Sequence, residues 1–91
     1  MPEARQRIDR WLWHARLVKT RSLAVSMIAS GHVRVNKKRV EAPAHFVRES
    51  DILTLAFPGR VRVLRVIGFA DRRGKAAAAA ALYEEIKPAS P

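Results

Sequence analysis

The sequence contains no cysteine, which excludes disulfide bonds and thiolate metal sites and is typical of proteins from a reducing compartment. Long apolar runs are also missing. The longest, Ala76 to Tyr83, is far shorter than a helix that spans a bilayer. The N-terminal Met-Pro-Glu-Ala-Arg-Gln is not followed by the apolar segment of a secretory signal. We therefore expect a cytoplasmic protein with no membrane partner.

Residue combinations that catalyse reactions or hold cofactors are missing too. The four glycines are isolated, so there is no glycine-rich phosphate loop. The three histidines form no i,i+4 pair, which argues against a metal site. The serines between residues 22 and 30 lack the G-x-S-x-G context of an activated nucleophile. We expect a protein without catalytic activity, cofactor, metal or small-molecule substrate.

Acidic residues are scarce, and their scarcity is uneven along the chain. Eighteen Lys and Arg face eight Asp and Glu, for a net charge of +10. Residues 1–40 carry +8 of this excess, and residues 41–91 carry only +2. A basic half on a small chain is typical of a protein that binds a polyanion. The alternative is a basic surface that serves only solubility.

Ninety-one residues predict a single domain, 1–91. After a frayed segment 1–6, apolar residues at Ile8, Trp11, Leu12 and Ala15 follow the i, i+3, i+4, i+7 spacing of an amphipathic helix.

A second helix follows the first. Thr20 is a suitable N-cap for it, and Gly31 is a suitable C-terminal stop.

The rest of the chain predicts a small sheet and a last helix. We expect a hairpin over 32–40, core positions at Phe46 and Val47, strands over 52–57 and 61–67, and a helix over 76–87. Pro58-Gly59 predicts a type II turn between the last two strands. The predicted order is ααββββα, an α+β fold with a small, mostly antiparallel sheet.

Two groups of cations stand out as candidate phosphate ligands. Lys19 and Arg21 lie at the start of the second helix, where the helix dipole disfavours positive charge, and no acid occurs between Asp9 and Glu41. An RNA phosphate would supply the missing negative charge. Lys37-Lys38-Arg39 crowds three more cations into the hairpin turn.

The two tryptophans of the first helix lie on different faces. We expect Trp11 in the core. Trp13 either packs against the C-terminal helix, which we favour, or stacks on a base.

These residues resemble a known RNA-binding unit. Arg7-Ile8-Asp9-Arg10-Trp11-Leu12, Thr20-Arg21-Ser22-x-Ala24 and Gly31-x-Val33-x-Val35-Asn36 resemble the S-four (S4) RNA-binding domain, over 7–53. Residues 54–91 would then add a strand pair and a C-terminal helix. Trp11-Leu12-Trp13-x-Ala15-Arg16, Lys19 to Ala24 and Ala80 to Glu85 are similar, more narrowly, to the ribosome-associated heat shock protein 15 family.

The resemblance implies a bacterial, cytoplasmic stress-response protein. It would bind the ribosomal RNA of large subunits that still hold a nascent chain on transfer RNA after aborted translation, and would help to recycle or rescue them. Transfer RNA is a further partner, and we expect a monomer. The residues expected to bind RNA are Arg7, Arg10, Arg16, Lys19, Thr20, Arg21, Ser22, Arg34, Asn36, Lys37, Lys38 and Arg39.

Two other functions fit the same sequence. The chain could be an RNA-binding accessory module of an RNA-modifying enzyme or a ribosome quality-control factor, or a protein-interaction module that docks through its alanine-rich helix. Members of the heat shock protein 15 family typically continue with a basic C-terminal extension, whereas this chain stops at Pro91. We expect either a short member or a truncated chain.

Overall fold

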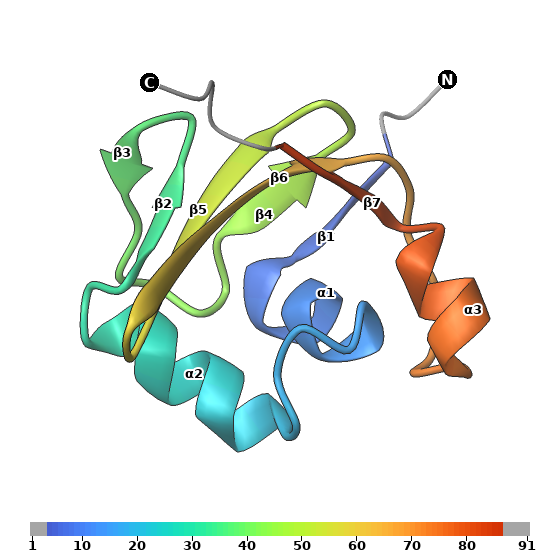
Figure 1. Ribbon diagram of the computed structural model, residues 1–91, viewed down its shortest axis with the longest axis horizontal. Coiled ribbons are helices and arrows are strands. Elements are labelled where there is room, and N and C mark those ends of the chain that lie inside the picture. The colour runs from blue at the N-terminus through green and yellow to red at the C-terminus, as the bar shows by residue number, and fades with distance from the viewer. Residues whose placement is uncertain (1–3, 87–91) are drawn as a thin grey trace.

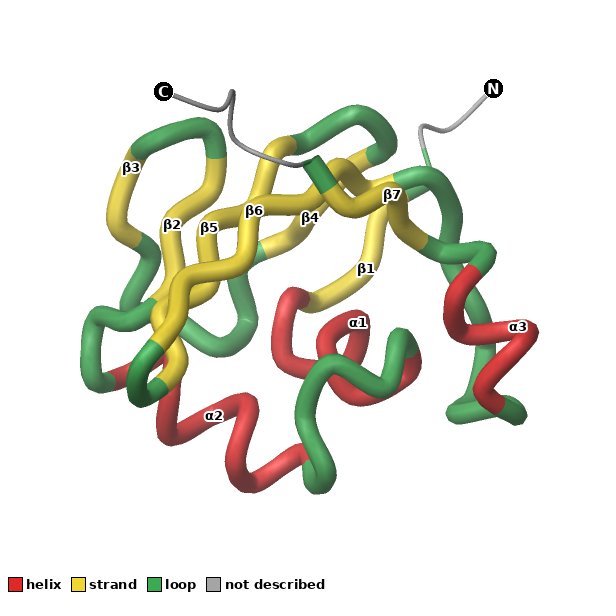
Figure 2. Tube along the Cα trace, in the orientation of Figure 1, coloured by secondary structure: helices red, strands yellow, loops and turns green. Residues whose placement is uncertain are grey.

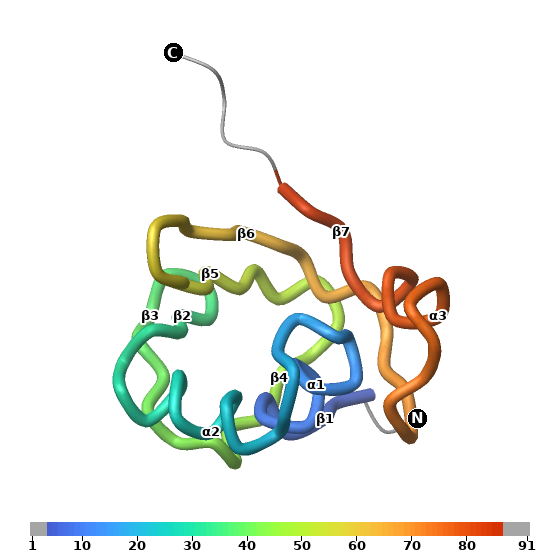
Figure 3. The backbone as a smooth tube through the Cα atoms, turned by 60° about the horizontal axis from the view of Figure 1, so that its bottom comes forward, coloured from blue at the N-terminus to red at the C-terminus, as the bar shows by residue number. Residues whose placement is uncertain are grey.

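A five-stranded antiparallel sheet carries two helices on one of its faces (Figure 1). The structure is a computed structural model and describes residues 4–86. The strand order is β3-β2-β5-β6-β7, with bounds Lys38–Arg39, Val33–Val35, Ile52–Phe57, Arg60–Val66 and Tyr83–Glu85. Helices α1 (Ile8–His14) and α2 (Arg21–Ala29) pack side by side beneath this sheet, as Figures 1 and 3 show. The predicted α+β fold is confirmed.

The sheet forms because its central strands alternate apolar and polar residues. On β5, Leu53 and Leu55 are fully buried, and they pair in register with Leu64 of β6 and Val33 of β2, among other partners. Side chains of paired residues share one face of a sheet, so this register builds an apolar face towards the helices. The predicted turn between β5 and β6 is confirmed by the positive φ of Gly59 (+79°).

Helix α2 has well-defined ends. The Thr20 hydroxyl oxygen accepts a hydrogen bond from Leu23 N at 3.0 Å, so Thr20 is the predicted N-cap of α2. At the other end of α2, Gly31 has φ of +80°, and the N–H groups of Gly31 and His32 donate to the carbonyls of Ile28 and Met27. This left-handed stop satisfies carbonyls that the helix would leave unpaired.

A second, two-stranded ribbon lies outside the main sheet. Strand β1 (Arg5–Arg7) pairs antiparallel with β4 (Phe46–Arg48). The prediction of a frayed segment 1–6 is therefore wrong for residues 5 and 6, because β4 offers them a pairing edge about forty positions later. The prediction for β4 is half right, since Val47 is fully buried and Phe46 is exposed.

The C-terminal segment differs most from the prediction. Helix α3 covers only Ala76–Ala80, and the chain then extends as β7 along β6 (Figure 2). Alanine favours a helix only weakly against tertiary contacts. Here the edge of β6 supplies hydrogen bonds, and Glu85 pairs with Arg62 and raises the pKa of that guanidinium. The expected helix at 81–86 is therefore a turn and a strand, and residue 87 lies outside the described residues.

Three side chains near the N-terminus form hydrogen bonds to the segment that links β6 to α3. Gln6 Nε2 and His14 Nδ1 lie 2.8 and 2.9 Å from the carbonyl oxygen of Ala70. Trp11 Nε1 donates to the carbonyl of Gly68 at 2.8 Å. A carbonyl only accepts, so His14 carries its proton on Nδ1. These bonds let His14 and the Trp11 indole nitrogen lie in the interior with their hydrogen bonds satisfied.

A substitution at Gly31 tests whether its left-handed backbone is needed to end α2. A Cβ there would lie 2.9 Å from Arg39 Nε, and the backbone is left-handed. We expect Gly31→Ala to lower the free energy of unfolding by about 2 kcal/mol, measured by urea denaturation. The control is Gly68→Ala, because a Cβ at Gly68 meets no atom within 4 Å. An equal loss in both variants would contradict this account.

Candidate nucleic-acid interface

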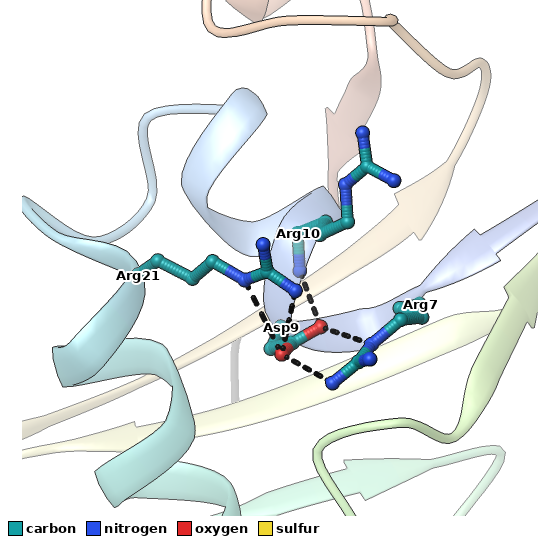
Figure 4. A network of polar contacts seen from close by, with 4 residues as sticks. All are labelled: Arg7, Asp9, Arg10 and Arg21. Carbon is teal, nitrogen blue, oxygen red and sulfur yellow. Dashed lines mark hydrogen bonds and ion pairs between the residues drawn. The ribbon is translucent and has the colours of Figure 1, made fainter.

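The buried carboxylate of Asp9 holds two arginines from different elements (Figure 4). Arg7 donates from Nε to Oδ1 at 3.1 Å and from Nη2 to Oδ2 at 3.0 Å. Arg21, from the first turn of α2, approaches Oδ2 with Nε and Nη2 at 3.4 Å each. The Asp9 side chain is 1% exposed, whereas the two arginines are 42% and 43% exposed. One carboxylate thus positions two guanidinium groups that solvent and ligands can still reach.

This geometry corrects one step of the sequence argument. Arg21 was expected to lack any acid that offsets its charge at the helix start. Asp9 offsets it from twelve positions earlier in the chain, because α1 and α2 pack together. The compensation is incomplete, since a single carboxylate faces both Arg7 and Arg21. The cluster keeps an excess positive charge.

Arg10 belongs to the same cluster through its backbone. Its N–H donates to Asp9 Oδ1 at 2.8 Å, while its side chain points away from the carboxylate (Figure 4). Lys19, Thr20 and Ser22 lie at the adjacent start of α2 and are exposed. The side-chain oxygen of Thr20 is engaged as the N-cap. The structure therefore brings together six of the twelve predicted RNA-binding residues, namely Arg7, Arg10, Lys19, Thr20, Arg21 and Ser22.

The second group lies on the hairpin of β2 and β3. Asn36 and Lys37 have φ of +51° and +73°, which makes them the two central residues of a type I′ turn. The Asn36 side chain is engaged, because Nδ2 donates to Asp51 Oδ1 and Oδ1 accepts from Ile52 N, both at 3.0 Å. Asn36 thus anchors the hairpin to β5, and Lys37 is exposed at its tip.

Three further cations lie on the two strands of the hairpin, one on β2 and two on β3. Arg34 and Arg39 are direct register partners, and Lys38 pairs with Val35. Like charges opposite each other on a sheet are unfavourable, so the pairing of Arg34 with Arg39 makes a bound anion favourable there. Arg39 lies against the end of α2, where its Nε would be 2.9 Å from a Cβ on Gly31.

Arg16 lies apart from both groups. It has φ of +59° at the end of α1, and its Nε donates to the carbonyl of Gly74 at 2.8 Å. Trp13 is half-buried and packs against the core, and its carbonyl accepts a hydrogen bond from Arg73 in the loop before α3. Both residues thus contact the loop before α3.

The β1–β4 ribbon adds three residues that were not among the expected RNA-binding residues, and one of them, Phe46, was expected in the core but is exposed. Arg5, Phe46 and Arg48 line an open groove of about 800 Å³ together with Lys38 and Arg39. The sequence does contain a pattern that could have identified this strand. Phe46-Val47-Arg48 alternates in the way of a strand with one buried and two exposed side chains.

Residues 4–86 also bear on metal binding and on membrane insertion. Within residues 4–86, no group of three or more His, Asp or Glu side chains is placed to hold a metal ion. In the same segment, no helix is both long and apolar enough to cross a membrane.

A substitution at Asp9 tests how much its ion pairs with Arg7 and Arg21 contribute to stability. We expect Asp9→Asn to lower the free energy of unfolding by about 2 kcal/mol, because it leaves Arg7 and Arg21 without their charged acceptor. Thermal or urea denaturation measures the loss. Asp71→Asn is the matched control at an exposed loop position and should change stability by less than about 0.5 kcal/mol. Equal effects of the two changes would argue against a structural role for the Asp9 cluster.

Comparison with known proteins places these features in a family. Residues 6–53 match the S4 domain. The heat shock protein 15 homolog of Haemophilus influenzae is 38% identical over 93% of this chain, and heat shock protein 15 of Escherichia coli is 40% identical over 92%. The chain spans only 64% and 62% of the lengths of these two relatives.

One solved structure also shares the fold of this chain. Heat shock protein 15 of Vibrio cholerae, described as trimeric, superposes with a TM-score of 0.84 at 35% identity, over 91% of this chain and 83% of that one. The trimeric relative weakens the expectation of a monomer. The match of sequence and fold confirms the S4-type architecture, and this chain belongs to the heat shock protein 15 family, with the RNA-binding S4 domain of that family.

Proposed function

We propose that this chain is a non-catalytic, cytoplasmic RNA-binding protein. It associates with ribosomal RNA of large subunits that carry a nascent chain on transfer RNA after aborted translation, and it aids their recycling or rescue. The observation that carries the proposal is the concentration of exposed cations over the Asp9 cluster and the β2–β3 hairpin, in a chain of this family.

The physical basis is electrostatic. Arg7 and Arg21 share one carboxylate, so a phosphate placed beside them completes the neutralisation that Asp9 begins. The first turn of α2 adds the positive end of a helix dipole. Such contacts position RNA without reading its sequence, and selectivity then comes from the shape of the RNA.

The hairpin extends this surface. Lys37 lies at the tip of a turn whose geometry is fixed by Asn36 and Asp51, and Lys38 follows on β3. A rigid turn presents these ammonium groups with less loss of backbone freedom on binding. We assign phosphate contacts to both lysines.

Salt dependence tests the electrostatic contribution. If about five phosphates are neutralised, the slope of log K against log salt should be roughly −3.5 to −4.5. Lys37→Gln and Lys38→Gln should each make the slope shallower by about 1, measured by titration of RNA at several salt concentrations. Lys75→Gln is the charge-matched control, because Lys75 precedes α3, far from the hairpin in Figures 1 and 3. A slope near zero, or an equal change with Lys75→Gln, would contradict the assignment.

Sucrose-gradient co-sedimentation tests the ribosomal target. We expect the protein to sediment with large subunits that carry peptidyl-transfer RNA and less with empty large or small subunits. The double variant Lys37→Gln, Lys38→Gln should remain at the top of the gradient, while Lys75→Gln should sediment like the unmodified chain. Equal sedimentation with all subunits would overturn the proposed target.

A further inference from the structure

The groove beside the hairpin joins two elements that are remote in sequence. It lies between the β2–β3 hairpin and the β1–β4 ribbon and measures about 800 Å³. Four cations line it, against two acids, Glu41 and Asp51. Asp51 is engaged by Asn36 Nδ2 and by the backbone N–H of Arg48. The groove is therefore basic, and its cations are Arg5, Lys38, Arg39 and Arg48.

An aromatic ring is exposed in this basic groove. Phe46 is 46% exposed, and the other five aromatic side chains of the chain, all within the described residues, are buried or half-buried. The guanidinium carbon of Arg5 lies 4.4 Å from the centre of the Phe46 ring. Exposing such a ring costs hydration free energy that burial in the core would recover. A ligand with a flat, polarisable face would cover it.

The register of the ribbon connects this ring to the Asp9 cluster. Phe46 is paired with Arg7, and Arg48 is paired with Arg5. Paired residues share a face, so three arginines surround Phe46 on one side of the ribbon, and Val47 lies buried on the other. Arg7 also binds Asp9, so one continuous basic face runs from the cluster to the groove.

We propose that Phe46 is a stacking platform for an unpaired base of the bound RNA. The inference deepens the proposed function and rests on it. The base takes the place of the Arg5 guanidinium over the ring. That guanidinium then stacks on the outer face of the base or binds a flanking phosphate, and Lys38 and Arg48 hold the backbone on either side. Only a base outside a helix can present its face in this way, so the preferred RNA contains a bulge, loop or single strand.

Two probe RNAs test the inference: a fully paired hairpin, and the same hairpin with a single bulged 2-aminopurine. We expect tighter binding of the bulged RNA and quenching of 2-aminopurine fluorescence on binding. Phe46→Leu keeps an apolar side chain of similar size but cannot stack. It should weaken binding of the bulged RNA by about 5- to 150-fold and change binding of the paired RNA by less than about 2-fold.

Two matched variants serve as controls. Phe46→Tyr keeps the ring and should retain both the preference for the bulged RNA and the quenching. Val61→Ala removes an exposed apolar side chain outside the groove lining and should behave like the unmodified protein. Thermal unfolding of each variant shows whether it is folded at the temperature of the binding assay.

The other possible outcomes contradict either the stacking role of Phe46 alone or the proposed function as well. If Phe46→Leu weakens both RNAs equally, or neither, or loses stability while Phe46→Tyr does not rescue selectivity, Phe46 has no stacking role and the proposed function stands. If the unmodified protein binds both RNAs equally well, the inference fails and general RNA binding stands. If it binds neither RNA, the inference and the proposed function fail together.

Discussion

The ion pairs of Asp9 with Arg7 and Arg21 connect the parts of the molecule that form its basic surface. Arg7 ends β1, Asp9 lies in the first turn of α1 and Arg21 begins α2, so one buried carboxylate fixes the relative positions of three elements. A buried carboxylate is unfavourable unless it is paired. The requirement to satisfy Asp9 therefore holds two arginines on the surface, side by side, in the absence of any ligand. Preorganised cations lose less freedom when a phosphate binds.

On the hairpin, too, a side chain with partners inside the protein holds exposed cations in place. Asn36 uses its amide to tie the turn to Asp51 and to the start of β5. The lysines beside it make no such bond in the described structure and remain exposed. Thr20 and Asn36 thus shape this surface through bonds within the chain, and the exposed cations beside them supply its positive charge.

The sequence predicted local features well and long-range pairings poorly. The Thr20 cap, the Gly31 stop and the Pro58-Gly59 turn depend on nearby residues, and all three are confirmed. The link between Asp9 and Arg21 could not be read from spacing, because it depends on how two helices pack. The strand at Tyr83–Glu85 was missed for a similar reason, since the edge of β6 outweighs the helix propensity of the alanines before it. The exposure of Phe46 depends on the unforeseen pairing of β4 with β1.

The hydrogen bonds from Gln6, Trp11 and His14 to the carbonyls of Gly68 and Ala70 affect how the chain can be divided. The segment that matches the S4 domain ends at residue 53, yet its first helix completes its polar interior with acceptors that follow β6. A fragment cut at the family boundary would leave these donors without acceptors and would expose apolar residues that β6 covers. The first helix therefore depends for its buried hydrogen bonds on residues 68 and 70, which lie beyond the segment that matches the S4 domain.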